Sequence, residues 1–284
     1  MLKKWFVILR AYSWPASLVP VLVGSVTAWR HGRFSWPDFC LTFLAALLAH
    51  SAANLSNTYY DFVKGVDRKE TADDRGLVDG LMKPRAMLFL AIGLFAAGGG
   101  LGLLLALKNH VPALLGLGAA GFALAWFYTA TGFAYKYRTL GDLGIFLAFG
   151  PGIVTGTALI QNGGLVPEAL WASIPVGLLI VAILHANNMR DVKSDGAADF
   201  TTLAAALGPV NAERFYYALI FAPYLFALTF ASIWPPVFCA LSLPLALKLK
   251  AMAARKDFSA LVPETAKLVA VYGLLLTIGL YIAA

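Results

Sequence analysis

Two sets of oxygen-bearing side chains in this sequence share one internal spacing. In chain order, the first set is Asn54, Asn57 and Asp61, and the second is Asn188, Asp191 and Asp195. Each member of the second set lies 134 residues after its counterpart. On a helix, spacings of three, four and seven residues place side chains on one face. In an otherwise apolar chain, two matched faces indicate a paired site for divalent metal and a phosphorylated substrate at a membrane surface.

The first set continues into a further acidic residue, Asp67. Gly65 offers a place for the helix to end, so Asp67 can fold back toward an ion that faces Asp61. Mg²⁺ prefers hard oxygen ligands and typically takes one or two carboxylates, several waters and substrate phosphate. Asn57, Asp61 and Asp67 suit that demand. The alternative interpretation is a polar helix end with solvated acids.

In the second set, Asp191 and Asp195 lie one helical turn apart and can face one ion. Asn187 extends the same ladder of four-residue steps. Four carboxylates facing one another would repel strongly, and two Mg²⁺ ions that bridge a diphosphate would relieve the repulsion. We therefore expect one group of metal-binding residues, with Asn188 assisting in catalysis. Its members are Asp61, Asp67, Asp191, Asp195 and Asn57.

Basic residues are interleaved with these acids and are candidates for binding the diphosphate, because Arg binds phosphate oxygens in bidentate fashion. Tyr128 is an aromatic residue that we expect to line the same pocket. The candidate substrate-binding residues are Arg68, Arg75, Lys136, Arg138, Lys193 and Tyr128. For each base, the alternative is a charge that only sets membrane topology. His50 and His185 precede the two sets and are expected to be hydrogen-bonded helix residues rather than ligands.

The elements that must hold these residues are apolar helices. The chain has 284 residues, of which 60% are hydrophobic and only 13% charged, whereas soluble domains have about 25% charged residues. Runs of roughly 20 apolar residues recur, the length needed to cross a bilayer as helix. We predict an all-α membrane protein with nine spans, the eighth interrupted by Pro244. The spans are 12–29, 38–58, 86–107, 111–130, 141–160, 168–187, 212–232, 235–250 and 263–283.

Charge predicts the orientation of these spans. All Lys and Arg except Arg30, Arg33 and Lys108 fall on one side of the predicted membrane. Cytoplasmic loops collect Lys and Arg, which predicts a cytoplasmic N-terminus, a C-terminus outside, and a location in the cell's inner membrane. The net charge of +7 is then a topological bias, and no nucleic-acid partner is expected. The acids also gather on the cytoplasmic side, which suggests a functional demand for carboxylates there.

The two sets end the second and sixth predicted spans. Their common offset predicts one transmembrane domain over residues 1–284, built from two four-helix pseudo-repeats over roughly 12–130 and 141–250, with a ninth helix left over. Membrane proteins often build a central site between such repeats.

These motifs resemble those of the UbiA-type intramembrane prenyltransferases. Asn57-Thr-Tyr-Tyr-Asp61 with Asp67 is similar to the first aspartate-rich motif of that family, and Asp191-Val-Lys-Ser-Asp195 is similar to the second. The resemblance covers essentially the whole chain. It implies a nine-helix fold and Mg²⁺-dependent transfer of a polyprenyl group from a polyprenyl diphosphate.

Within the family, the sequence most resembles the 1,4-dihydroxy-2-naphthoate polyprenyltransferases of menaquinone biosynthesis. The two aspartates of the first motif have five residues between them, as in that branch, whereas the 4-hydroxybenzoate branch has three. Thr58 departs from the pattern, since Asp is common at that position. The resemblance implies an aromatic acceptor and a catalytic group of Asp61, Asp67, Asp191, Asp195, Asn57 and Asn188.

Three other interpretations stay open at this point. The first is a prenyltransferase for another acceptor, such as 4-hydroxybenzoate or homogentisate, in place of the naphthoate. A secondary transporter also combines repeats with charged residues between helices, although its acids would be expected near the middle of the membrane. A scaffold or lipid-binding protein would need no chemistry at all.

Overall fold

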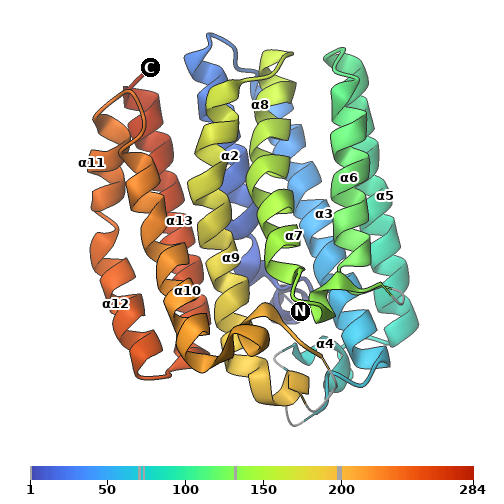
Figure 1. Ribbon diagram of the computed structural model, residues 1–284. Coiled ribbons are helices and arrows are strands. Elements are labelled where there is room, and N and C mark those ends of the chain that lie inside the picture. The colour runs from blue at the N-terminus through green and yellow to red at the C-terminus, as the bar shows by residue number, and fades with distance from the viewer. Residues whose placement is uncertain (1, 70–71, 73, 131–132, 197–199) are drawn as a thin grey trace.

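The computed structural model describes residues 2–69, 72, 74–130, 133–196 and 200–284. The described part is a bundle of long helices that run side by side (Figure 1). Its first half contains α1 (Leu2–Ile8), α2 (Pro15–Arg30), α3 (Trp36–Val63), α4 (Arg75–Val78), α5 (Pro84–Lys108) and α6 (Ala113–Phe127). Its second half contains α7 (Gly141–Leu147), α8 (Val154–Asn162), α9 (Pro167–Gly196), α10 (Leu203–Ala227), α11 (Trp234–Ala240), α12 (Leu243–Ala254) and α13 (Phe258–Ile282). Short η1 (Ala11–Ser13), η2 (Tyr135–Tyr137) and the π-helical η3 (Ala148–Ile153) complete it.

Each of the nine predicted spans overlaps a helix or a broken helix, so the all-α prediction is confirmed. Five described helices are long and apolar enough to cross a membrane, where the continuous helix Gly141–Asn162 (α7, η3 and α8) counts as one. The number is six if α11 and α12 count as one bent span. The count of nine crossings is therefore still a prediction. The break expected at Pro244 is present, with Pro244 in the first turn of α12 and a bend of 46° between α11 and α12.

Two helices differ from the predicted spans for local reasons. α9 continues to Gly196, so the connection that was expected to begin at residue 188 begins later, and Asp191 and Asp195 lie on helix. α10 begins at Leu203 rather than near 212, with a kink at Gly208. The kink arises because Pro209 has no backbone N–H and crowds the preceding turn, and Gly208 takes a positive φ of 72°.

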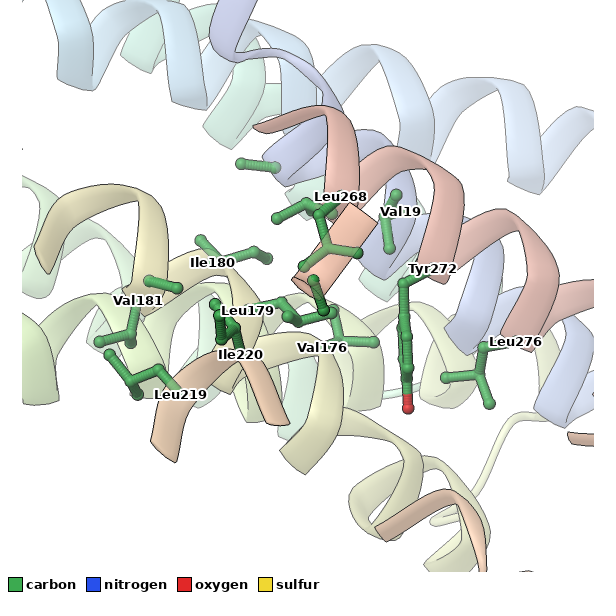
Figure 2. Close-up of a cluster of buried hydrophobic side chains, with 14 of the residues drawn as sticks. Val19, Val176, Leu179, Ile180, Val181, Leu219, Ile220, Leu268, Tyr272 and Leu276 are labelled. Carbon is green, nitrogen blue, oxygen red and sulfur yellow. The ribbon is translucent and has the colours of Figure 1, made fainter. Parts of the chain in front are cut away.

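The largest core lies among α2, α9, α10 and α13. Figure 2 shows its centre, where Val19 and Leu268 lie between the helices near Ile180, and Tyr272 stands beside Leu276. The Tyr272 hydroxyl donates a hydrogen bond of 2.7 Å to the carbonyl oxygen of Pro223. Many large apolar side chains instead face outward, including Leu165 at 82% exposure. An outer face of this kind suits lipid rather than water.

Close helix packing depends on glycine at a few crossings. Gly24 of α2 lies so near α8 that an added Cβ would meet the carbonyl oxygen of Val154 and would sit 2.8 Å from Cβ of Thr157. Gly116 of α6, in contrast, has nothing within 4 Å of the position of an added Cβ.

We predict opposite effects of alanine at these two glycines. Gly24→Ala should lower the melting temperature of the purified protein, because overpacking costs about 1–3 kcal/mol. Gly116→Ala should raise the melting temperature slightly, because alanine is favoured over glycine inside a helix by about 0.5–1 kcal/mol. Thermal unfolding of both variants in one detergent is the measurement. A shift of the same sign in both would contradict the packing argument.

Candidate active site

The two acidic sets come from the same end of two helices, α3 and α9, which both pack against α2. Asp61 lies in the last turn of α3, and Asp191 and Asp195 lie in the last turns of α9. The C-terminal ends of α3 and α9 reach the same end of the bundle (Figure 1). All three carboxylates line one cavity of about 1110 Å³, together with Asp67.

Asp67 reaches the cavity because α3 ends as the sequence predicted. The helix stops at Val63, and Gly65 adopts a positive φ of 73°. The backbone N–H groups of Val66 and Asp67 then both donate hydrogen bonds to the carbonyl oxygen of Asp61, at 2.9 and 3.2 Å. This turn returns the chain toward the helix end, so the predicted fold-back of Asp67 is confirmed.

Asp61 has two donors from the segment before α7. The Lys136 ammonium donates to its Oδ2 at 2.6 Å and to Oδ1 of Asn57 at 3.2 Å, and the Tyr137 hydroxyl donates to its Oδ1. The Asp61 side chain is buried at 5% exposure, and that of Lys136 is 20% exposed. Lys136 is thus the counter-ion of Asp61 and bridges it to Asn57.

Asp67 in the loop and Asp195 on α9 have less compensating positive charge than Asp61. Burial, and after it the charge of Asp61, raises the pKa of Asp67 to about 7. Burial raises the pKa of Asp195 to about 6, and the charges of Asp191 and Asp61 add to this effect although Lys136 opposes it. Asp191 pairs with the neighbouring Arg190 at 2.7 and 2.8 Å. Raised pKa values with these causes mark a place where further positive charge is favourable.

The donor set fits a hard divalent cation that arrives with its own oxygen ligands. The cavity presents carboxylate and amide oxygens, which Mg²⁺ prefers. Among the described residues, no three Asp, Glu, His or Cys side chains converge closely enough to enclose an ion by themselves. Mg²⁺ is commonly bound by one or two carboxylates together with waters and substrate phosphate, which is compatible with this donor set.

The predicted residues separate into two groups. Those that line the cavity are Asp61, Asp67, Asp191, Asp195, Asn57, Asn188, Lys136 and Tyr128. Arg68, Arg75 and Arg138 do not line it: Arg68 donates to the carbonyl oxygen of Gly65 at 3.3 Å, Arg75 pairs with Asp79, and Arg138 lies over the ring of Phe133. The Lys193 side chain lies outside the part of the structure that can be described. Diphosphate binding by these four stays a prediction without geometric support.

Three basic residues that are not among the candidates from the sequence also line the cavity, namely Arg10, Arg190 and Lys267. Arg10 comes from the N-terminal segment, adopts a positive φ of 52°, and approaches Asp74 at 3.9 Å. Asp74 is in turn held by the hydroxyl of Thr58 and by the backbone N–H of Gly76. One signal in the sequence bears on this arrangement: at Thr58, where the resemblance implied Asp, the hydroxyl donates to the carboxylate of Asp74.

Both histidines are hydrogen-bonded helix residues, as predicted. His50 Nδ1 lies 2.7 Å from the hydroxyl of Ser17, and its Nε2 lies 3.2 Å from that of Ser13. His185 Nδ1 lies 2.8 Å from Oδ2 of Asp142.

Beyond the acids, the cavity is mostly apolar. Its walls continue along α3, α5, α6 and η3 to Leu105, Leu114 and Ile160, near the opposite end of the bundle. Phe95 and Phe122 line its middle, with their rings 5.3 Å apart in an edge-on arrangement. The cavity thus joins a charged end to a long apolar compartment, which suits an amphiphile with an anionic head and a hydrocarbon tail.

Comparisons of the sequence and of the fold with known proteins identify the family. The model of the UbiA prenyltransferase family matches residues 17–281. The "UbiA prenyltransferase domain-containing protein 1" of Mus musculus is 38% identical over 287 residues, which cover 97% of this chain and 83% of the mouse protein.

Solved structures share the fold. A UbiA homolog from Aeropyrum pernix K1, in its apo form, aligns with a TM-score of 0.73 at 19% identity, covering 95% of this chain and 97% of that one. A UbiA homolog from Archaeoglobus fulgidus, bound to GPP and Mg²⁺, aligns with a TM-score of 0.66 at 17% identity, covering 96% and 99%. With a family match over nearly its whole length and a relative of this similarity, the chain belongs to the UbiA prenyltransferase family.

Proposed function

We propose that this chain transfers a polyprenyl group from a polyprenyl diphosphate to an aromatic acceptor in a Mg²⁺-dependent reaction, with 1,4-dihydroxy-2-naphthoate as the acceptor. The observation that carries the proposal is that one cavity is lined by the carboxylates of Asp61, Asp67, Asp74, Asp191 and Asp195 at one end and by apolar walls beyond them. Membership in a prenyltransferase family supports the reaction class. The five residues between Asp61 and Asp67 support the choice of naphthoate.

In this mechanism, Asp61, Asp67, Asp191 and Asp195 hold the metal–diphosphate head of the donor substrate, with Asn57 beside them. When bound, Mg²⁺ supplies positive charge to the diphosphate oxygens as the allylic C–O bond weakens. Lys136 stands at the same place and neutralises charge on the leaving diphosphate, since stabilising charge where it develops is usually the dominant catalytic effect.

The apolar compartment receives the isoprenoid tail and excludes water, which would otherwise capture the allylic cation. Aromatic walls such as Tyr128 stabilise that cation through their π faces by about 0.5–2 kcal/mol. The allylic carbon then forms a C–C bond with the electron-rich ring, while the electron pair of the broken C–O bond leaves with diphosphate. For the naphthoate, the bond forms at the ring carbon that bears the carboxylate, and loss of CO₂ returns its bonding electron pair to the ring and restores the aromatic system.

The proposed setting is a bilayer with the acidic end of the bundle in the cytoplasm. The asymmetry of Lys and Arg supports this orientation, and the apolar outer face supports a lipid environment. The carboxylates stand at one end of α3 and α9 rather than midway along them, which weighs against a secondary transporter.

The metal-binding role of the acids predicts a large effect of charge removal. Asp61→Asn and Asp191→Asn should each lower the rate of product formation by about 100-fold or more, because each removes a charge that holds the metal–diphosphate head. EDTA should abolish the reaction and excess Mg²⁺ should restore it. Asp257→Asn, an exposed residue outside the cavity, is the matched control and should leave the rate unchanged. Full turnover by the Asp61 or Asp191 variants would falsify the metal assignment.

The positions of the basic residues predict which of them contribute most to the rate. Lys136→Met should lower kcat by about 100-fold, because Lys136 lies against Asp61 where the leaving diphosphate would bind. Arg68→Gln, Arg75→Gln and Arg138→Gln should each have a much smaller effect, since these side chains do not line the cavity. Steady-state rates of the four variants, purified in the same lipid, decide the question. A loss for any of the arginine variants that matches the loss for Lys136→Met would show that its loop moves into the site.

The acceptor assignment predicts an order of preference. Given one polyprenyl diphosphate, the purified protein should show a higher kcat/KM for 1,4-dihydroxy-2-naphthoate than for 4-hydroxybenzoate or homogentisate, and the naphthoate product should lack the carboxyl group. Mass spectrometry of the prenylated products measures both. Preference for another acceptor would overturn the naphthoate assignment while leaving the reaction class intact.

A further inference from the structure

The helices that bear the two acidic sets correspond with an offset of 130 residues rather than 134. Near the start of α3, Pro37 and Asp38 match Pro167 and Glu168 at the start of α9. Near the ends of the two helices, the same offset matches Asn57 with Asn187 and Asp61 with Asp191. α3 begins at Trp36 and α9 at Pro167, so the assigned helix starts are 131 residues apart, within one residue of this register. The counterpart of Asn57 is then Asn187, and Asn188 is displaced by one residue.

Asn188 has another partner. Its side-chain amide donates to Oδ1 of Asp142 at 3.2 Å, and Oδ2 of the same carboxylate lies 2.8 Å from Nδ1 of His185. The remaining ring nitrogen of His185 donates to the carbonyl oxygen of Ala212 at 3.1 Å. His185 is fully buried and Asp142 is 5% exposed. Asn188 is therefore anchored in a hydrogen-bonded network that joins α7, α9 and α10.

The side-chain oxygen of Asn187, in contrast, lacks a hydrogen-bond partner among the described residues. Asn187 lines the cavity, yet this oxygen is buried. Buried polar atoms are nearly always paired, and an exception calls for a specific reason. Because the oxygen of this amide has no hydrogen-bond partner among the described residues, a half-turn of the group exchanges its oxygen and nitrogen without breaking a bond to that oxygen.

We propose that Asn187 supplies an amide oxygen to the divalent cation bound with the diphosphate, as the counterpart of Asn57, while Asp142 and His185 hold Asn188 away from that ion. The inference rests on the proposed function, because it assigns residues within the same site. It gives the second acidic set the same composition on its helix face as the first: one amide, then one carboxylate four residues later.

Mn²⁺ binding measured by electron paramagnetic resonance tests this division of roles without relying on turnover. The full-length protein is titrated with Mn²⁺ in the presence of inorganic pyrophosphate. Asn187→Ala should raise the Kd for Mn²⁺ by about tenfold or more, a loss at least as large as those seen for outer-shell partners of metals. Asn187→Asp, which keeps an oxygen at this position, should retain binding close to that of the native protein.

Asn188→Ala is the neighbouring comparison. It should keep the Kd for Mn²⁺ within about twofold, while lowering the melting temperature because Asp142 loses a buried hydrogen-bond donor. Asn187→Leu keeps the side-chain volume without the oxygen and carries the test if the alanine variant gives little folded protein. An unchanged Kd in Asn187→Leu or Asn187→Ala, or an equal loss in Asn188→Ala, overturns the inference. Absence of Mn²⁺ binding by the native protein would count against the proposed function itself.

Discussion

Repulsion among carboxylates in a largely apolar cavity is the constraint on which the site depends. Asp61, Asp67 and Asp195 are close enough that the charge of Asp61 raises the pKa of each of the other two. The protein offsets part of this repulsion with Lys136, held against Asp61 at 2.6 Å. The remainder favours a cation that arrives with an anionic ligand, since a metal bound to diphosphate brings positive charge and the missing oxygen ligands together.

The segment before and at the start of α7 holds the two acidic sets in register. Lys136 and Tyr137 donate to Asp61 on α3. A few residues later, the carboxylate of Asp142 accepts hydrogen bonds from the α9 side, including one from the amide of Asn188. One short stretch of chain thus contacts the ends of both helices. Because η2 and α7 are tied to both, a shift of either helix end would disturb hydrogen bonds to the other set.

The sequence predicted the features that follow from local patterns. Runs of apolar residues located the helices, and Gly65 located the turn that returns Asp67 toward Asp61, because a left-handed residue at a helix end is a local property. Which bases face the cavity could not be predicted this way. Arg68 and Arg75 follow the first acidic set closely in sequence and Arg138 lies two residues after Lys136, but the direction of a loop side chain depends on how the loop folds, which here places Arg75 against Asp79 and Arg138 over Phe133.

The same limit applies to adjacent residues on a helix. Asn187 and Asn188 are equal in type, and the sequence spacing selected Asn188 because it preserves the offset of 134 from Asn54. Asn54 itself donates to the hydroxyl of Ser13 at 3.1 Å, so the match joined two amides that are each held by neighbours within the bundle. The register that matches Pro37 and Asp38 with Pro167 and Glu168 instead pairs two amides, Asn57 and Asn187, that are each four residues before a cavity-lining aspartate. A four-residue step keeps an amide and its carboxylate on one face of a helix. Helix geometry is therefore a sounder basis for relating the two halves of the site than the sequence spacing of polar residues alone.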